Sequence, residues 1–179
     1  TAYNENIYAQ TSRWIRYRVK PDKIIADVYY RYTAKEQHRL PLNSYRVKTV
    51  SHGVGLDGEY LFSKQLRAGI DGKYDYIQTS FNGDFLSHWL SVNTEWIWYR
   101  VAGERLFLSA AIDRVISDHT GSLPYETANG LPVGWTWSGS LRYEKRINSF
   151  ISAGGSLQFR KRAEQQSIVT ANLEVKAYF

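Results

Sequence analysis

The sequence predicts an all-β protein, an antiparallel up-and-down β-barrel that crosses a membrane. Three observations predict this fold. Apolar residues recur at every second position, aromatic residues stand at the ends of the apolar faces, and short connections alternate with long ones. No apolar run approaches the ~18 residues of a membrane helix, which excludes a helical membrane protein. The mean hydropathy of −0.46 fits a barrel, because lipid-facing and lumen-facing residues alternate along each strand.

The alternation can be followed along the whole chain, and we expect residues 1–179 to form one domain. It begins around residues 15–19, where Ile15, Tyr17 and Val19 oppose Trp14, Arg16 and Arg18. Further alternating runs follow at 24–32, 54–62, 66–76, 90–98, 106–112, 135–143, 151–159 and 169–179. These make about nine strands of roughly 10–13 residues, enough for the ~9–11 residues with which a tilted strand crosses the hydrocarbon layer.

The positions of the aromatic residues separate a membrane barrel from a soluble β-fold. The middle of most apolar faces is Ala, Val, Leu or Ile, and the ends are aromatic. Tyr and Trp prefer a membrane interface, where the ring stays in apolar surroundings and its polar group reaches the headgroups. One expected belt contains Tyr30, Tyr32, Tyr74, Tyr76, Trp135, Trp137 and Phe159. The other contains Tyr60, Phe62, Trp96, Trp98, Tyr143 and Phe179.

The connections are expected to differ at the two ends of the strands. Short ones are predicted at 21–23, 63–65, 101–105 and 147–149, and longer ones at 33–51, 79–85, 117–134 and 161–166. Short turns on one side and long loops on the other are typical of outer-membrane barrels.

The last twelve residues resemble the terminal strand of bacterial outer-membrane proteins. Apolar residues stand at every second position before a final Phe: Val169, Ala171, Leu173, Val175, Ala177 and Phe179. In that family such a strand helps the outer-membrane assembly machinery to recognise the protein, which implies an outer-membrane location. The segments Leu123–Glu126 and Gly130–Trp135 are also similar to large barrels of the Bacteroidota type.

The number of strands raises the question of a larger barrel. With Phe179 on the periplasmic side, an odd count places the start of the first strand outside the cell, whereas complete barrels normally have an even count. Either Ala2 to Gln10 conceals a tenth strand, or the chain is the C-terminal portion of a larger barrel. The absence of an initiator methionine favours the second alternative, a C-terminal portion of a larger barrel.

Charged residues occupy the strand face opposite the apolar one, and this face is predicted to line the lumen. The set is Arg16, Arg18, Arg67, Asp71, Lys73, Asp75, Glu95, Asp113, Arg142, Glu144 and Arg160. In a large barrel these charges would line a water-filled passage, and in a small one they would pair and fill the interior. We therefore expect a channel or export barrel for polar or anionic substrates. A structural or partner-binding subunit of an envelope complex is the alternative.

Other chemistry receives less support from the sequence. The four histidines have no metal-ligand spacing, cysteine is absent, and we expect no metal and no cofactor. Ser117, His119 and Glu126 leave a lipid-modifying enzyme as a third reading, although they lie in a predicted loop that does not fix their geometry, so we expect no enzyme. The net charge of +6 favours anionic partners, with lipid headgroups and lipopolysaccharide first. Nucleic acid is not expected, because most aromatic residues lie on the face opposite the charges.

Overall fold

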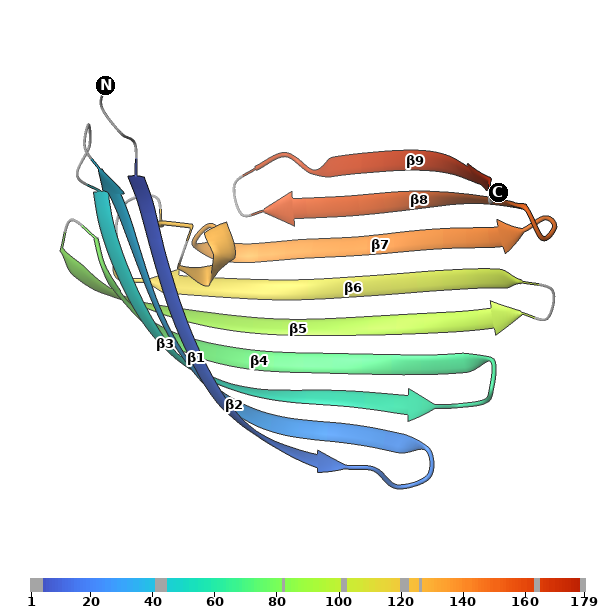
Figure 1. Cartoon of the computed structure of the whole chain (residues 1–179), viewed down its shortest axis with the longest axis horizontal. Coiled ribbons are helices and arrows are strands. Elements are labelled where there is room, and N and C mark those ends of the chain that lie inside the picture. The colour runs from blue at the N-terminus through green and yellow to red at the C-terminus, as the bar shows by residue number, and fades with distance from the viewer. Residues whose placement is uncertain are drawn as a thin grey trace.

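The computed structural model describes residues 5–40, 45–81, 83–100, 103–119, 123–125, 127–162 and 165–177. Within them, nine strands follow one another in sequence order in a single antiparallel sheet (Figure 1). They are β1 (Glu5–Val19), β2 (Ile24–Leu40), β3 (Tyr45–Leu61), β4 (Leu66–Ser80), β5 (Asp84–Arg100), β6 (Glu104–Ser117), β7 (Gly134–Arg146), β8 (Ile151–Arg162) and β9 (Ile168–Ala177). The predicted all-β class and the up-and-down antiparallel order are confirmed.

The sheet is curved and open. β1 and β9 are its two edges, and the described residues show no pairing between them. One 3₁₀ turn, η1 (Ala128–Gly130), lies in the connection between β6 and β7, on the inner side of the curve (Figure 1). Residues 5–10, which one of the two alternatives assigned to a further strand, are instead the beginning of β1, where Glu5 pairs with Leu40 of β2.

The connections distinguish the two ends of the sheet. We call the end with the connections β1–β2, β3–β4, β5–β6 and β7–β8 the turn rim, and the end with the other four the loop rim. The loop-rim connections predicted at 33–51, 79–85 and 161–166 are too long, because β2 continues to Leu40, β4 to Ser80 and β8 to Arg162. The β6–β7 connection, residues 118–133, is the one long connection with described residues at the loop rim.

The extra length of β2 and β3 comes from pairing between polar residues, for which apolar alternation gives no signal. Glu36 on β2 accepts two hydrogen bonds from Arg46 on β3, at 3.0 and 2.7 Å. On the other face of the same hairpin Val47 and Thr49 are buried, and β-branched residues suit a pleated strand. Strands therefore reach 17 residues, beyond the roughly 10–13 that the sequence predicts.

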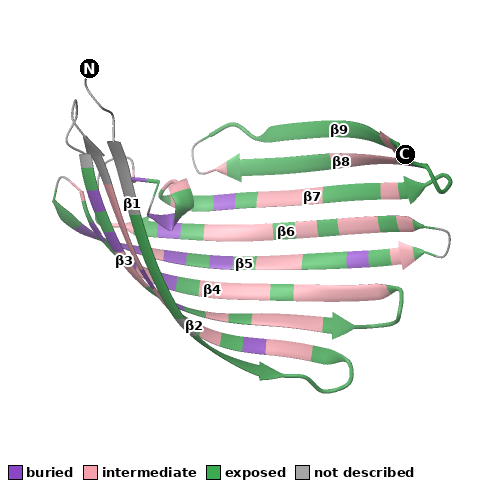
Figure 2. Ribbon diagram, viewed as in Figure 1, coloured by how far each residue is buried: buried purple, intermediate pink, exposed green. Residues whose placement is uncertain are grey.

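The strand register gives the sheet one apolar and one polar face, as predicted from the period of two. The apolar face is exposed across the whole sheet, from Ile15 and Val28 through Leu108 to Leu173. The buried hydrophobic residues lie on the polar face or in the β6–β7 connection, and all but Ile97, which lies toward the turn rim on β5, are near the loop rim. Figure 2 shows this burial at the ends of β3 to β6 nearest η1. The usual arrangement of a soluble protein, with the apolar face covered, is thus reversed over most of the sheet.

Candidate functional site

All the residues predicted to line a lumen are brought to the polar face. The register places Asp71 opposite Asp57 and Asn93, and Asp113 opposite Ser91 and Thr136. The register places every residue of the predicted set on this same face of the sheet. The set comprises Arg16, Arg18, Arg67, Asp71, Lys73, Asp75, Glu95, Asp113, Arg142, Glu144 and Arg160. Four further acidic residues, Asp27, Asp57, Glu59 and Glu174, join this face.

Across β1 to β4 most of the charges of the polar face are paired. Asp27 is almost fully buried and accepts hydrogen bonds from Arg18, from Nε to Oδ1 at 2.8 Å and from Nη2 to Oδ2 at 3.1 Å. Arg16 also contacts Asp27, and its Nη2 lies 3.7 Å from Asp57 Oδ2. Nearer the turn rim, Arg67 Nη1 lies 3.4 Å from Glu59 Oε1.

One ion pair of this region spans an intervening strand. Arg31 on β2, Gly53 on β3 and Asp75 on β4 lie in one row of the register. Arg31 Nη2 crosses over Gly53 and donates to both Asp75 oxygens, at 3.0 and 2.9 Å. A Cβ at position 53 would lie 2.0 Å from Asp75 Oδ1, so glycine is required for this crossing. In the next row the Tyr29 ring covers Gly55, where a Cβ would lie 2.3 Å from Tyr29 Cζ.

Trp89 connects this ion pair to the second half of the sheet. Its side chain is nearly buried, and its indole N–H donates to Asp113 Oδ1 at 3.0 Å. Lys73 Nζ lies 3.5 Å from the centre of the indole ring, a cation–π contact. The middle of the polar face therefore carries Arg31, Asp75, Lys73 and Asp113 around one aromatic ring.

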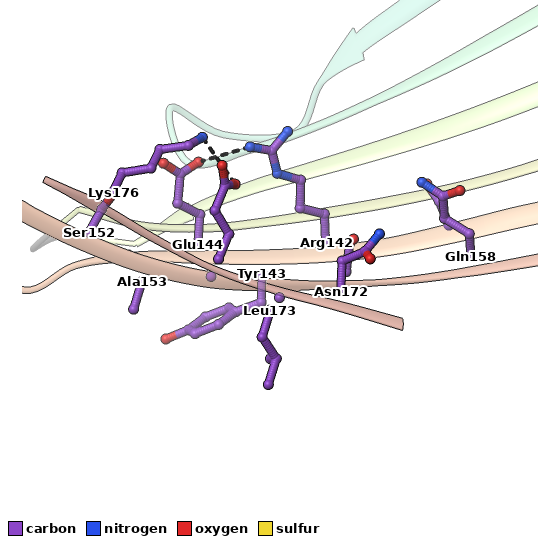
Figure 3. A pocket seen from close by; sticks show the side chains of 14 residues that line it. Arg142, Tyr143, Glu144, Ser152, Ala153, Gln158, Asn172, Leu173 and Lys176 are labelled. Atoms are coloured by element: carbon purple, nitrogen blue, oxygen red, sulfur yellow. Dashed lines mark ion pairs between the residues drawn. The ribbon is translucent and has the colours of Figure 1, made fainter. Parts of the chain in front are cut away.

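Across β5 to β9 the polar face is hollow, and small polar side chains form part of its lining. One cavity of about 640 Å³ is lined in part by Ser91, Asn93, Ser109, Ser138 and Ser140. A second, of about 770 Å³, lies over β7, β8 and β9, and Figure 3 shows its side chains. Small hydroxyl and amide groups leave space for water and offer it hydrogen bonds.

The second cavity also shows how the two faces of the sheet differ. Arg142, Glu144 and Lys176 extend to the polar side in Figure 3, and Tyr143 and Leu173 extend to the other side. The ion pairs are open to solvent and loose: Arg142 Nη2 lies 3.8 Å from Glu144 Oε2, and Lys176 Nζ lies 3.2 Å from Glu174 Oε2.

The β6–β7 connection packs onto the polar face, which the sequence analysis did not predict. Leu123 and Leu131 contact a buried cluster of Ile77, Trp89, Val115 and Ala128. Thr127 is fully buried, and its hydroxyl is 2.9 Å from that of Thr79 on β4. The signal that could have revealed this packing is the pair Leu123 and Leu131 flanking Thr127 inside a connection that otherwise looks like an exposed loop.

The described aromatic residues that were predicted to form two belts lie on the apolar face. All twelve that the structure describes are exposed except Tyr32 and Tyr76, which are half-buried. Tyr74, Tyr76, Trp135, Trp137 and Phe159 lie toward the loop rim, and Tyr30 and Tyr32, which the register aligns with Tyr74 and Tyr76, lie in the middle of the longer strand β2. Tyr60, Phe62, Trp96, Trp98 and Tyr143 lie toward the turn rim, and Phe179 lies outside the described residues.

Two histidines belong to the loop-rim belt. Tyr30 Oη lies 2.7 Å from His52 Nδ1, and Tyr74 Oη lies 2.6 Å from His88 Nδ1. These tyrosine partners of the histidines were not predicted from the sequence. His38 belongs to β2, and its side chain lies outside the described residues.

The residues considered for lipid hydrolysis do not form a catalytic arrangement in the described part of the chain. The backbone N–H of His119, not its ring, donates to Ser117 Oγ at 3.2 Å, and the ring stacks on Phe85 at 4.5 Å. Ser117 Oγ is otherwise bonded to Ser87 and to the carbonyl of Leu86. Glu126 lies outside the described residues.

At the turn rim a carboxylate is held by two cations. Lys145 Nζ lies 3.1 Å from Glu104 Oε1, and Arg100 Nη1 lies 3.5 Å from Oε2. The hydrogen bond from Lys145 is the largest cause of a lowered pKa at Glu104, and burial opposes it.

The predicted assembly residues of β9 occupy the apolar face of an edge strand. Leu173 is 94% exposed, since no further strand covers it. The other described members, Val169, Ala171, Val175 and Ala177, are exposed as well.

Among the described residues no cluster of three potential metal-ligating side chains occurs. None of the helical segments in that part of the chain has the length and apolar character to span a membrane. No protein-family model matches the chain, and no curated protein is significantly similar to it in sequence.

Proposed function

We propose that this sheet is part of the wall of an outer-membrane β-barrel channel, and that polar or anionic solutes pass along its polar face. The observation that carries the proposal is the exposure of the apolar face, which has aromatic side chains at both rims and aliphatic ones between them. Lipid is the surrounding in which such a face is stable, and the aromatic rims fit the two interfaces.

The open edges fit the same proposal. β1 and β9 present unpaired backbone groups, which are costly in lipid unless further strands pair with them and close the barrel. We propose that β9, with its alternating apolar residues, is the strand recognised by the outer-membrane assembly machinery. Lipopolysaccharide and other lipids with anionic headgroups would then surround the basic chain.

Lipid contact can be tested with one substitution on each face of β6. Leu108→Arg places a charge on the apolar face, where we expect a loss of about 2–4 kcal/mol of stability in lipid vesicles. Ser109→Arg is the control, because Ser109 is the next residue along β6 and its side chain lies on the hollow polar face. Equal unfolding free energies in urea titrations of the two vesicle-inserted variants would contradict the assignment of the faces.

The hollow over β5 to β9 favours a passage over a filled interior. Single-channel conductance in planar bilayers is the direct test, and we expect ion flow with a selectivity set by the polar face. Ser138 lines the hollow, so Ser138→Glu should shift the reversal potential in the direction of greater cation selectivity. Ser138→Arg should shift it in the direction of greater anion selectivity. No conductance, or identical reversal potentials, would contradict the proposed passage.

The second candidate is a structural or partner-binding barrel with a filled interior. The observation favouring it is the charge pairing across β1 to β4, where Asp27 and Asp75 are buried and bound by arginines. This candidate predicts no conductance in a protein that still inserts into vesicles, so the bilayer measurement separates the two.

A further inference from the structure

A small cavity lies between the β6–β7 connection and the polar face. Its volume is about 90 Å³, enough for a few water molecules or one small ion. Ala128 and Asn129 of η1 border it on one side, and Arg31, Lys35 and Thr49 border it on the other. Both η1 residues have positive φ, 49° and 53°, so tertiary packing holds the backbone of this border in a strained conformation.

Two polar atoms bordering the cavity have no partner within the described residues. Thr49 is 3% exposed, and neither its hydroxyl nor the Nε–H of Arg31 forms a hydrogen bond. Leaving a buried polar group unsatisfied costs about 1–3 kcal/mol, so a polar occupant is expected there. Both atoms can donate a hydrogen bond, which favours an occupant that accepts.

The charge around the cavity is positive. Asp75 borders it too, but both of its oxygens accept hydrogen bonds from Arg31 Nη2, which compensates its negative charge. Lys35 forms no ion pair with any carboxylate in the described part of the chain. One lysine charge is therefore left over, and Thr33 adds another buried hydroxyl.

We propose that this cavity binds a small oxyanion of the size and charge of inorganic phosphate. Lys35 supplies the charge, and Arg31 Nε–H and the Thr49 hydroxyl donate hydrogen bonds to its oxygens. Charge-assisted hydrogen bonds of this kind are roughly twice as strong as neutral ones. The proposal depends on the packing of the β6–β7 connection and not on membrane insertion. If the sheet lines a passage, the site lies beside it, at the loop rim.

The test is isothermal titration calorimetry of the purified chain in detergent micelles with inorganic phosphate. We expect one site per chain and a parallel change in the fluorescence of Trp89, which borders the cavity. Lys35→Gln should weaken binding about tenfold or more, because it removes the uncompensated charge. Thr49→Val should also weaken it, and Thr49→Ser, which keeps a hydroxyl, should retain it.

Lys48→Gln is the matched control, because Lys48 neighbours Thr49 on β3 but is exposed on the opposite face. This variant should bind phosphate as the unaltered chain does. Absence of phosphate binding by the folded, unaltered chain would overturn the proposal and assign the cavity to water. So would equal affinities of Lys35→Gln and Lys48→Gln. A failed channel with intact phosphate binding would overturn the proposed function alone.

Discussion

The polar faces of β1–β4 and β5–β9 are built on different principles, although both come from the same alternation. In β1–β4 the carboxylates of Asp27 and Asp75 are buried and paired with arginines, and Gly53 and Gly55 make room for large side chains that cross them. In β5–β9 small hydroxyl side chains such as those of Ser109, Ser138 and Ser140 are frequent, and Arg142 and Glu144 are open to solvent and loosely paired. The first half therefore resembles a filled interior and the second a wet surface. Polarity alone does not distinguish the two; side-chain volume does.

The largest difference between the halves is expected when one carboxylate is neutralised in each. Asp75→Asn keeps the shape of the side chain but leaves the Arg31 charge without its carboxylate partner. Breaking a buried ion pair in this way lowers the free energy of unfolding by about 3–5 kcal/mol. Arg31 is partly exposed, so we expect the lower end of that range, about 3 kcal/mol. Glu144→Gln in the other half should cost less than about 1 kcal/mol, because the Arg142–Glu144 pair is exposed.

Urea unfolding of the two variants in the same micelles would measure this difference. Equal losses of unfolding free energy would show that the two halves of the polar face do not differ in pairing strength.

A smaller effect is expected from adding one methyl group at a glycine. Gly55→Ala places a Cβ 2.3 Å from Tyr29 Cζ, and overpacking of this kind costs about 1–3 kcal/mol. Gly72→Ala is the control, because no heavy atom lies within 4 Å of its Cβ position. Thermal unfolding of both variants would be compared. If Gly55→Ala had the same unfolding temperature as the unaltered protein, close packing of the Tyr29 ring on Gly55 would not contribute to stability.

The hydroxyl pairs extend the comparison to the β6–β7 connection. Thr127→Val leaves the buried Thr79 hydroxyl without its partner, which we expect to cost about 1–2 kcal/mol and to loosen the connection. Ser140→Ala removes the similar 2.8 Å bond to Ser109, but water can replace it in the open hollow, so the cost should be about 0.5 kcal/mol. Hydrogen exchange at residues 123–131 should rise in the first variant only.

These differences show what the sequence could predict and what it could not. The two faces and the order of the strands were predictable, because alternation such as that of Ile70 and Asp71 is a local property of each strand. The length of β2 and β3 was not, because Glu36 and Arg46 continue the pairing after the apolar signal ends.

The packing of Leu123 and Leu131 against Trp89 joins segments far apart in the chain, and no periodic pattern marks it. For the same reason, the charged set on the polar face was predicted without its pairing. Arg31 reaches Asp75 only because a third strand places Gly53 between them. Contacts of this kind depend on register, which a single sequence fixes only loosely.

The smallest expected effect concerns pH at the turn rim, at the start of β6 in the second half. The pKa of Glu104 is lowered from its ordinary value of 4.5, mainly by the hydrogen bond from Lys145. A carboxylate with a lowered pKa stabilises the fold at pH values above its ordinary pKa, and this contribution disappears as the pH falls through the lowered pKa.

Glu104→Gln should therefore reduce stability slightly at neutral pH and leave it unchanged in strong acid. Unfolding midpoints measured from pH 7 down to about pH 1 should converge for the two proteins at the acid end, since Glu104 is protonated only below its lowered pKa. A gap that persists at the acid end would mean that Glu104 contributes through packing, because a charge interaction must vanish once the carboxylate is protonated.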